Sequence, residues 1–186
     1  KIFELVHKKK DSNQILKEVL LLEESFMLHN SIEKKNERVF YSKLEDSKLS
    51  KQQIILFKEL SIINNQGVTR ICLHQSDSNS LHEMIMVHTK PAKIGPLKQD
   101  KESISYHIID GSIEVKICDE LENIKKLYTL KSLSFSDNEL NSIRIKPNDY
   151  RIVSSLSNYA IFLEITNGPF EDNDTLWLNA KKNKNA

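Results

Sequence analysis

Two histidines, His82 and His88, are the first side chains in this chain whose type and spacing suggest metal or acid–base chemistry. Imidazole is a common transition-metal ligand and the group most often used for proton transfer near neutral pH. The even spacing puts both on one face of a strand, but six extended residues span roughly 20 Å, so the two rings cannot bind one ion together. We expect each to be a surface or hydrogen-bonded structural histidine, with a catalytic role as the alternative.

A second set of positions has the spacing of a metal site. The cupin signature runs Gly, five residues, His-x-His, three or four residues, Glu, six residues and Gly, and a second motif supplies another histidine. In this chain the matching positions are occupied by Pro91, Leu97, Gln99, Ile104 and Gly111, and the second-motif histidine corresponds to Arg151. The spacing therefore resembles that of the cupins, although the residues that would bind the metal are absent.

The surrounding residues resemble the WbuC-type cupin-fold family of bacterial polysaccharide gene clusters. The resemblance covers roughly residues 37–170 and rests on collinear segments: Arg38-Val-Phe-Tyr-Ser42, Arg70-Ile-Cys-Leu-His74, Leu81-His-Glu-Met-Ile85, Ser105-Tyr-His-Ile-Ile-Asp-Gly111 and Phe162-Leu-Glu-Ile-Thr-Asn-Gly-Pro-Phe170. It implies an all-β cupin barrel (a double-stranded β-helix, or jelly roll), a role in surface-polysaccharide or sugar-nucleotide metabolism, and a homodimer, because cupins often dimerise through their sheets.

The chemistry of the substituted positions predicts a degenerate member of this family without a metal or other cofactor. A cupin metal needs imidazole nitrogens and a carboxylate that converge on one point. Leu97 and Ile104 have no lone pairs, Gln99 is a weak neutral ligand, and the Arg151 guanidinium would repel a cation.

A pocket can remain where the metal is lost. If Leu97, Gln99, Ile104, Tyr106 and Arg151 all face the barrel interior, they form an apolar wall with an amide, a phenol and a fixed positive charge. Arg151 would then pair with a small anionic or sugar-related ligand, Gln99 and Tyr106 would orient it, and the two aliphatic residues would exclude water. In the alternative, Arg151 points outward and the interior is filled.

Three functions follow from these observations. The first is a non-catalytic module that binds a small ligand or another protein. The second is a metal-free sugar-nucleotide isomerase or epimerase, for which Tyr106 with His88 or His107 is the candidate proton-transfer pair. The third is a metalloenzyme with non-standard ligands. His107 has the opposite parity to Ile104, so we expect it on the outer sheet face or at a dimer contact.

The elements that position these residues are helices followed by strands. Apolar residues recur at helical spacing from Ile15 to Phe26. Ser50 with Gln53 resembles a capping box for a second helix, which carries Ile54, Ile55, Phe57, Leu60 and Ile63. Eight β-branched and aromatic runs follow, at 69–74, 81–89, 105–109, 113–118, 125–130, 142–145, 150–154 and 160–166. Asp110-Gly111 predicts a two-residue hairpin. We expect a helical extension over 1–66, the barrel over 67–170, and a partly disordered tail over 171–186.

The composition excludes several classes of protein. The 27 basic and 26 acidic side chains nearly cancel, so no global field attracts nucleic acid or an anionic membrane. Cys72 and Cys118 are too few for a disulfide framework or a Cys-rich zinc site. No apolar run has the roughly 20 residues that a membrane span requires. We expect a cytoplasmic protein that neither inserts into a membrane nor binds nucleic acid.

Overall fold

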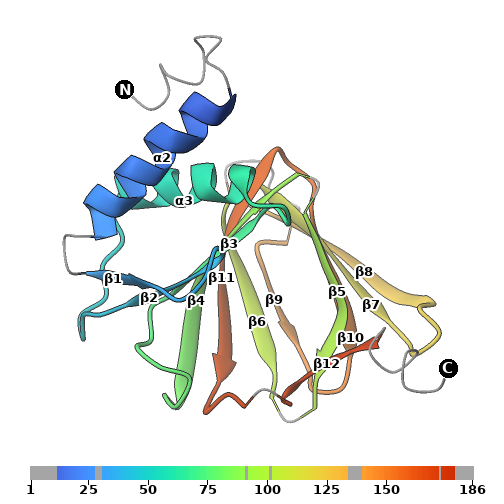
Figure 1. Ribbon diagram of the computed structural model, residues 1–186. Helices are drawn as coiled ribbons and strands as arrows, with labels where there is room; N and C mark the ends of the chain where they lie inside the picture. The colour runs from blue at the N-terminus through green and yellow to red at the C-terminus, as the bar shows by residue number, and fades with distance from the viewer. Residues whose placement is uncertain are drawn as a thin grey trace, which may run out of the picture.

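The computed structural model describes residues 12–27, 31–90, 92–100, 102–133, 140–171 and 173–178. Two helices, α2 (Ser12–Met27) and α3 (Lys51–Ile63), lie together on one side of a β-barrel (Figure 1). No helix in these ranges is long and apolar enough to cross a membrane.

The strands form two facing sheets. The first has the order β1-β2-β3-β4-β11-β6-β9, and the second has the order β12-β5-β10-β7-β8. The bounds are β1 Ile32–Lys34, β2 Val39–Ser42, β3 Val68–Cys72, β4 Leu81–Thr89, β5 Lys93–Gln99, β6 Ile104–Asp110, β7 Ser112–Cys118, β8 Ile124–Lys131, β9 Ser142–Ile145, β10 Tyr150–Ser155, β11 Tyr159–Asn167 and β12 Thr175–Trp177.

The order of the eight strands from β4 to β11 is that of a jelly roll. The first, eighth, third and sixth of them lie side by side in one sheet, and the second, seventh, fourth and fifth lie in the other. Two Greek keys folded against each other produce this alternation, which is the architecture of cupins. The predicted all-β cupin barrel with an N-terminal helical extension is therefore confirmed as a fold.

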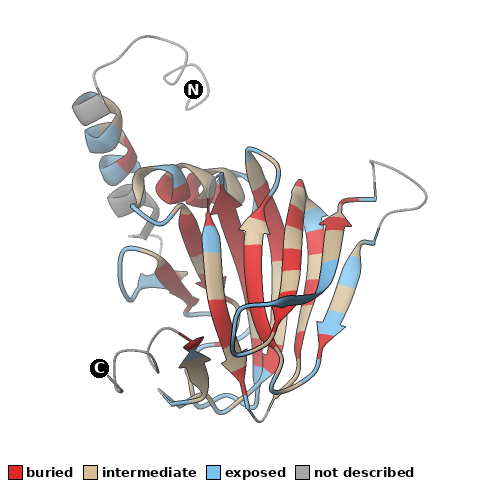
Figure 2. Cartoon of the chain, turned by 90° about the vertical axis from the view of Figure 1, so that its right-hand side faces the viewer, coloured by how far each residue is buried: buried red, intermediate tan, exposed pale blue. Residues whose placement is uncertain are grey.

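The first sheet is buried on both faces around β3 and β4, because α3 packs against their outer side (Figure 2). On β4, Met84 and Met86 face the barrel interior, whereas Ile85 and Val87 face outward. The outward residues pack with Leu56, Phe57 and Leu60 of α3 in a second core. Burial on both faces explains why β4 reads as a nearly continuous apolar run.

Helix α3 begins as predicted. The Ser50 side chain accepts a hydrogen bond from the Gln53 backbone N–H at 3.2 Å, and the Gln53 side chain accepts one from the Ser50 N–H at 2.6 Å. This reciprocal capping box satisfies backbone donors that would otherwise have no partner.

Helix α2 packs less completely than its periodicity suggests. Val19 is buried and Ile15 packs against the same core, but the leucines of α2 are exposed: Leu16, Leu20, Leu21 and Leu22.

The predicted hairpin at Asp110-Gly111 is wrong. Strand β6 pairs with β11 and β9, and β7 pairs with β10 and β8, so this turn carries the chain from one sheet to the other. Gly111 has a φ of +77°, and a Cβ at this position would collide with the Tyr159 carbonyl oxygen. The glycine is therefore required, but for a corner between sheets.

Four strands lie outside the eight predicted runs. Strands β1 and β2 fall within the stretch expected to be a helical extension, and β2 extends the first sheet by parallel pairing with β3. Strand β12 falls within the expected tail and pairs with β5. Strand β5 contains Gly95 and Pro96, residues that usually interrupt strands, which explains why the pattern did not reveal it. The expected disorder of the last residues concerns 179–186, which lie outside the described ranges.

Candidate functional site

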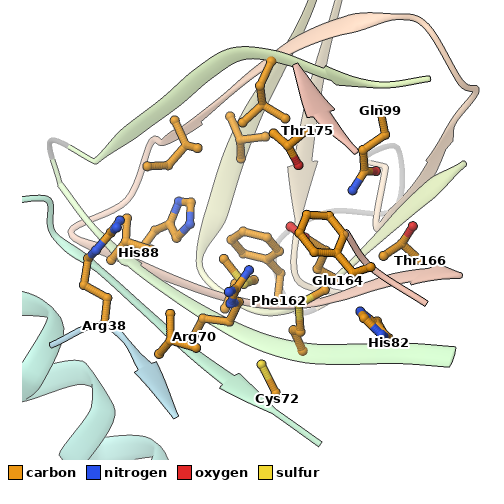
Figure 3. A pocket seen from close by; sticks show the side chains of 18 of the residues that line it. Arg38, Arg70, Cys72, His82, His88, Gln99, Phe162, Glu164, Thr166 and Thr175 are labelled. Carbon is orange, nitrogen blue, oxygen red and sulfur yellow. The ribbon is translucent and has the colours of Figure 1, made fainter. Parts of the chain in front are cut away.

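The barrel encloses a cavity of about 480 Å³ between the two sheets. Its wall combines apolar side chains with an unusual number of charged and polar ones (Figure 3). The polar and charged members include Lys35, Arg38, Arg70, His74, Asp77, His82, His88, Gln99, Tyr106, Arg151, Glu164 and Thr166. A cavity of this size and lining is suited to a small molecule with polar groups.

Arg151 faces the barrel interior. It lies on β10, opposite Leu97 of β5, and is 5% exposed. Its Nε donates a hydrogen bond of 2.8 Å to the Tyr106 hydroxyl on β6, in the other sheet. The alternative in which Arg151 points to solvent is therefore wrong. Burial raises the pKa of Tyr106, so the phenol is neutral and remains a hydrogen-bonding group near pH 7.

Gly95 positions this arginine. The residue has a φ of +110°, and a Cβ there would collide with the Arg151 carbonyl oxygen. The absence of a side chain lets β5 approach the backbone of β10 closely at Arg151. The register shift between Arg151 and Val153 in the β10–β5 pairing lies at the same place.

Two further charged residues, Arg70 and Glu164, line the cavity and were not predicted. Glu164 of β11 is directly opposite both Tyr106 of β6 and Met84 of β4. Burial raises the pKa of the Glu164 carboxyl, and the charges of Arg151 and Arg70 oppose that shift. The Arg70 Nε is buried and has no hydrogen-bond partner among the described residues. The sequence did contain a signal for them. Arg70 and Glu164 occupy the same alternate positions as the inward-facing apolar residues of β3 and β11.

His88 is also inside the barrel, contrary to expectation. It is 1% exposed, lines the cavity, and packs edge-on against the Phe162 ring at a centroid distance of 4.9 Å. Neither ring nitrogen has a hydrogen-bond partner in the described part of the chain. Burial lowers the pKa of His88 to about 4, so the imidazole is neutral near pH 7. His88 is therefore neither a surface histidine nor one held by hydrogen bonds to described residues.

His82 is a buried, hydrogen-bonded histidine, which is one of the roles predicted for it. Its ring stacks on His74 at 4.1 Å, and its Nε2 lies 3.2 Å from the Asp77 carbonyl oxygen. Asp77 also accepts hydrogen bonds from the Tyr41 hydroxyl and from the Lys35 ammonium. These contacts form a polar rim on the part of the cavity that is furthest from His88 along β4.

The remaining predicted residues divide between the cavity, the core and the surface. Leu97 and Gln99 line the cavity, and the buried Gln99 Oε1 has no partner among the described residues. Ile104 is 1% exposed and belongs to the apolar core, but it is not among the cavity-lining residues. His107 faces outward, where its Nδ1 lies 3.0 Å from the Ser142 hydroxyl.

The cavity has an excess of positive charge. Arg70 and Arg151 face a single interior carboxyl, Glu164, whose pKa is raised by burial. At the rim, Lys35 pairs with Asp77 at 2.8 Å. The buried guanidinium of Arg151 and the half-buried one of Arg70 favour ligands with a carboxylate or phosphate, which they would bind through charge-assisted hydrogen bonds. Within the described ranges, no group of three or more His, Cys, Asp or Glu side chains is arranged to hold a metal ion.

No protein-family model and no curated protein matches this chain. Many solved structures share its fold in part, and three of them are representative. They are the capsular polysaccharide assembling protein CapF from Staphylococcus aureus (10% identity, TM-score 0.48, 62% of this chain and 31% of CapF), KdgF from Halomonas sp. (11%, 0.43, 59% and 84%), and a cupin superfamily protein from Desulfitobacterium hafniense (14%, 0.42, 56% and 79%). This chain thus spans less than a third of the length of CapF. At these identities the likeness concerns the fold alone.

Proposed function

We propose that this chain is a cupin-type binding protein whose barrel holds a small anionic ligand without a catalytic metal. The observation that carries the proposal is the burial of Arg151 inside the cavity with its Nε bonded to Tyr106. In the proposed site Arg151 pairs with the ligand's anionic group, and Gln99 and Tyr106 orient it. Leu97 excludes water, and Ile104 supports the site from the apolar core behind it.

The charge inside the barrel supports an anion rather than a neutral ligand. A buried charge is costly unless it is paired, and one carboxyl, Glu164, faces the two guanidinium groups of Arg70 and Arg151. Among the ion pairs of the described residues, none joins Glu164 to either arginine. An anionic ligand would supply the missing countercharge and two or more charge-assisted hydrogen bonds.

The proposed biological setting is surface-polysaccharide or sugar-nucleotide metabolism. This part of the proposal rests on the resemblance of residues 37–170 to the WbuC-type family. A degenerate cupin in such a setting would bind a sugar-related anion, or would use the occupied barrel to signal to a protein partner.

Direct titration tests the anion site. Isothermal titration calorimetry with gluconate, glucose 6-phosphate and inorganic phosphate should detect binding to the wild-type chain, and Arg151→Gln should weaken it by about tenfold or more. Arg144→Gln is the matched control, because Arg144 is exposed on β9. The proposal is wrong if none of the three anions binds, or if Arg151→Gln binds them as well as the wild type does.

A metal-free isomerase or epimerase is the second candidate. Tyr106 and His88 both line the cavity, so they are still candidates for the proton-transfer pair. His107 lies on the outer face and is no longer a candidate. Incubation of the chain with nucleotide sugars in D₂O, followed by NMR, would detect exchange of a carbon-bound hydrogen. Exchange that is lost in Tyr106→Phe would favour this candidate over a silent binding module.

A further inference from the structure

His88 is a polar side chain that the barrel buries without a partner. It is 1% exposed, and neither Nδ1 nor Nε2 has a hydrogen bond to a described residue. Its cross-strand neighbours cannot supply one from their side chains, because His88 is opposite Val68 on β3 and Ala160 on β11. Buried polar groups are normally satisfied, so an unsatisfied one that lines a cavity suggests a missing partner inside that cavity.

The packing around the imidazole holds it in a defined orientation. Phe162 contacts the ring edge-on at a centroid distance of 4.9 Å and an interplanar angle of 74°. In Figure 3 the ring lies on the opposite side of the cavity from Gln99, with Phe162 between them. A ring that aromatic packing holds in the cavity wall has a defined orientation, and a small shift of the wall would bring one of its nitrogens to a bound molecule.

The chemistry of this ring selects a neutral partner group. Burial keeps the imidazole uncharged near pH 7, so it has one N–H donor and one acceptor nitrogen. A hydroxyl group matches this pair, because it can donate to the bare nitrogen or accept from the N–H. A second anionic group matches poorly, because a neutral ring brings no countercharge for it.

The spacing along β4 indicates how far a hydroxyl group bound by His88 would lie from Arg70. Arg70 is opposite Met86 on β4, and His88 is the next inward-facing residue on the same strand. Two residues of a strand span roughly 7 Å. An acid with a chain of several hydroxylated carbons can extend over that distance.

We propose that the ligand is a hydroxylated acid, of the sugar-acid or sugar-phosphate class, and that His88 binds one of its hydroxyl groups while Arg70 and Arg151 bind its anionic group. This inference rests on the anion site proposed above. It adds a residue that recognises the neutral part of the ligand and so determines which anions are selected.

Calorimetry with a matched pair of acids tests the inference. Gluconate and hexanoate have the same number of carbons and the same carboxylate, but only gluconate has hydroxyl groups. The wild type should bind gluconate at least about tenfold more tightly than hexanoate. His88→Phe should reduce that ratio to near one without weakening hexanoate. Glucose 6-phosphate tested in parallel shows whether the anionic group is a carboxylate or a phosphate.

Two further variants and an NMR measurement serve as controls for this test. His88→Gln retains a donor and an acceptor and should recover part of the preference. His107→Phe, on the outer face, is the matched histidine control and should keep the wild-type ratio. If His88→Phe does not fold, as judged by circular dichroism, the ¹⁵N resonances of the wild-type His88 ring must still shift when gluconate is added.

The outcomes separate the two proposals. If no acid binds, the anion site itself is wrong, and this inference falls with it. If gluconate and hexanoate bind equally, or His88→Phe keeps the wild-type ratio, or the ring resonances do not move, the anion site stands but His88 does not recognise a hydroxyl group.

Discussion

Arg151 and Tyr106 form a buried hydrogen bond of 2.8 Å across the barrel, from a guanidinium on β10 in one sheet to a phenol on β6 in the other. Their Cα positions are 45 residues apart in the chain. This contact links the two sheets through polar groups, and it sets the orientation in which Arg151 would meet a ligand.

Removal of the phenol oxygen should therefore destabilise the protein. Tyr106→Phe leaves the buried Arg151 Nε–H without its acceptor, which costs about 1–3 kcal/mol of unfolding free energy. Tyr150→Phe is the matched control: the Tyr150 hydroxyl is buried and has no partner among the described residues, so its loss should be neutral or slightly stabilising. Urea unfolding of both variants measures the difference. Equal effects would contradict the role given to the Arg151–Tyr106 bond.

Neutralisation of Glu164 should tighten anion binding. The Glu164 carboxyl faces Arg70 and Arg151, and its negative form repels a ligand anion. Glu164→Gln should raise the affinity for gluconate severalfold at pH 7.5. Because burial raises the pKa of Glu164, wild-type affinity should increase as the pH falls towards that pKa, and the increase should be smaller in the variant. Calorimetry at several pH values measures both slopes, and a loss of affinity in Glu164→Gln would show that the carboxyl helps to bind the ligand.

The free energy of unfolding should depend on pH through His88. Folding lowers the pKa of His88 from 6.5 to about 4, so the unfolded chain takes up the proton first as the pH falls. The contribution of His88 to the free energy of unfolding is therefore fully present above pH 6.5 and is lost as the pH falls towards 4. His88→Phe should reduce the slope near pH 5 by up to about 1.4 kcal/mol per pH unit.

The change in slope has a matched packing control. Met86→Leu alters the neighbouring inward position without removing a titrating group, and should keep the wild-type slope. His74 will contribute to the slope that remains, because burial also lowers its pKa to about 4. An unchanged slope in His88→Phe would mean that His88 takes up its proton in the folded state as readily as in the unfolded chain.

Gly95→Ala should disturb both stability and the site. The φ of +110° is unfavourable for alanine, and the new Cβ would collide with the Arg151 carbonyl oxygen. We expect a loss of about 2–4 kcal/mol together with weaker anion binding. Lys93→Ala, at an exposed position of the same strand, should have little effect on either quantity. Thermal unfolding and calorimetry on the two variants test this, and a stable Gly95→Ala protein with normal affinity would contradict it.

Metal analysis tests the substituted ligand positions. Protein expressed with iron, manganese, nickel and zinc, and purified without chelators or a histidine tag, should contain no stoichiometric metal by plasma mass spectrometry. The reason is chemical: the aligned positions hold Leu97, Gln99, Ile104 and Arg151, which offer no imidazole or carboxylate. One bound metal per chain would overturn the metal-free proposal and require ligands from elsewhere.

Local patterns in the sequence were sufficient to predict much of the fold. The capping box at Ser50 and Gln53 depends on residues three apart, so it could be recognised without the tertiary structure. Strand β4 was visible because four apolar residues follow one another in it, and β7 because its β-branched residues alternate with polar ones. The alternation of side chains along a strand is also a local property, and it correctly predicted that His107 lies on the outer face.

Strand pairing and the contents of the cavity were decided by the tertiary structure. Asp110-Gly111 looks the same whether it closes a hairpin or joins two sheets, and only the long-range pairing of β6 with β11 and of β7 with β10 distinguishes these cases. Arg70, His88 and Glu164 come from three strands and line one cavity because the sheet aligns them. The sequence by itself predicted that the positions aligned with the cupin signature hold no metal-binding residues. The fold determined which polar groups replace them, because their convergence depends on contacts between residues far apart in the chain.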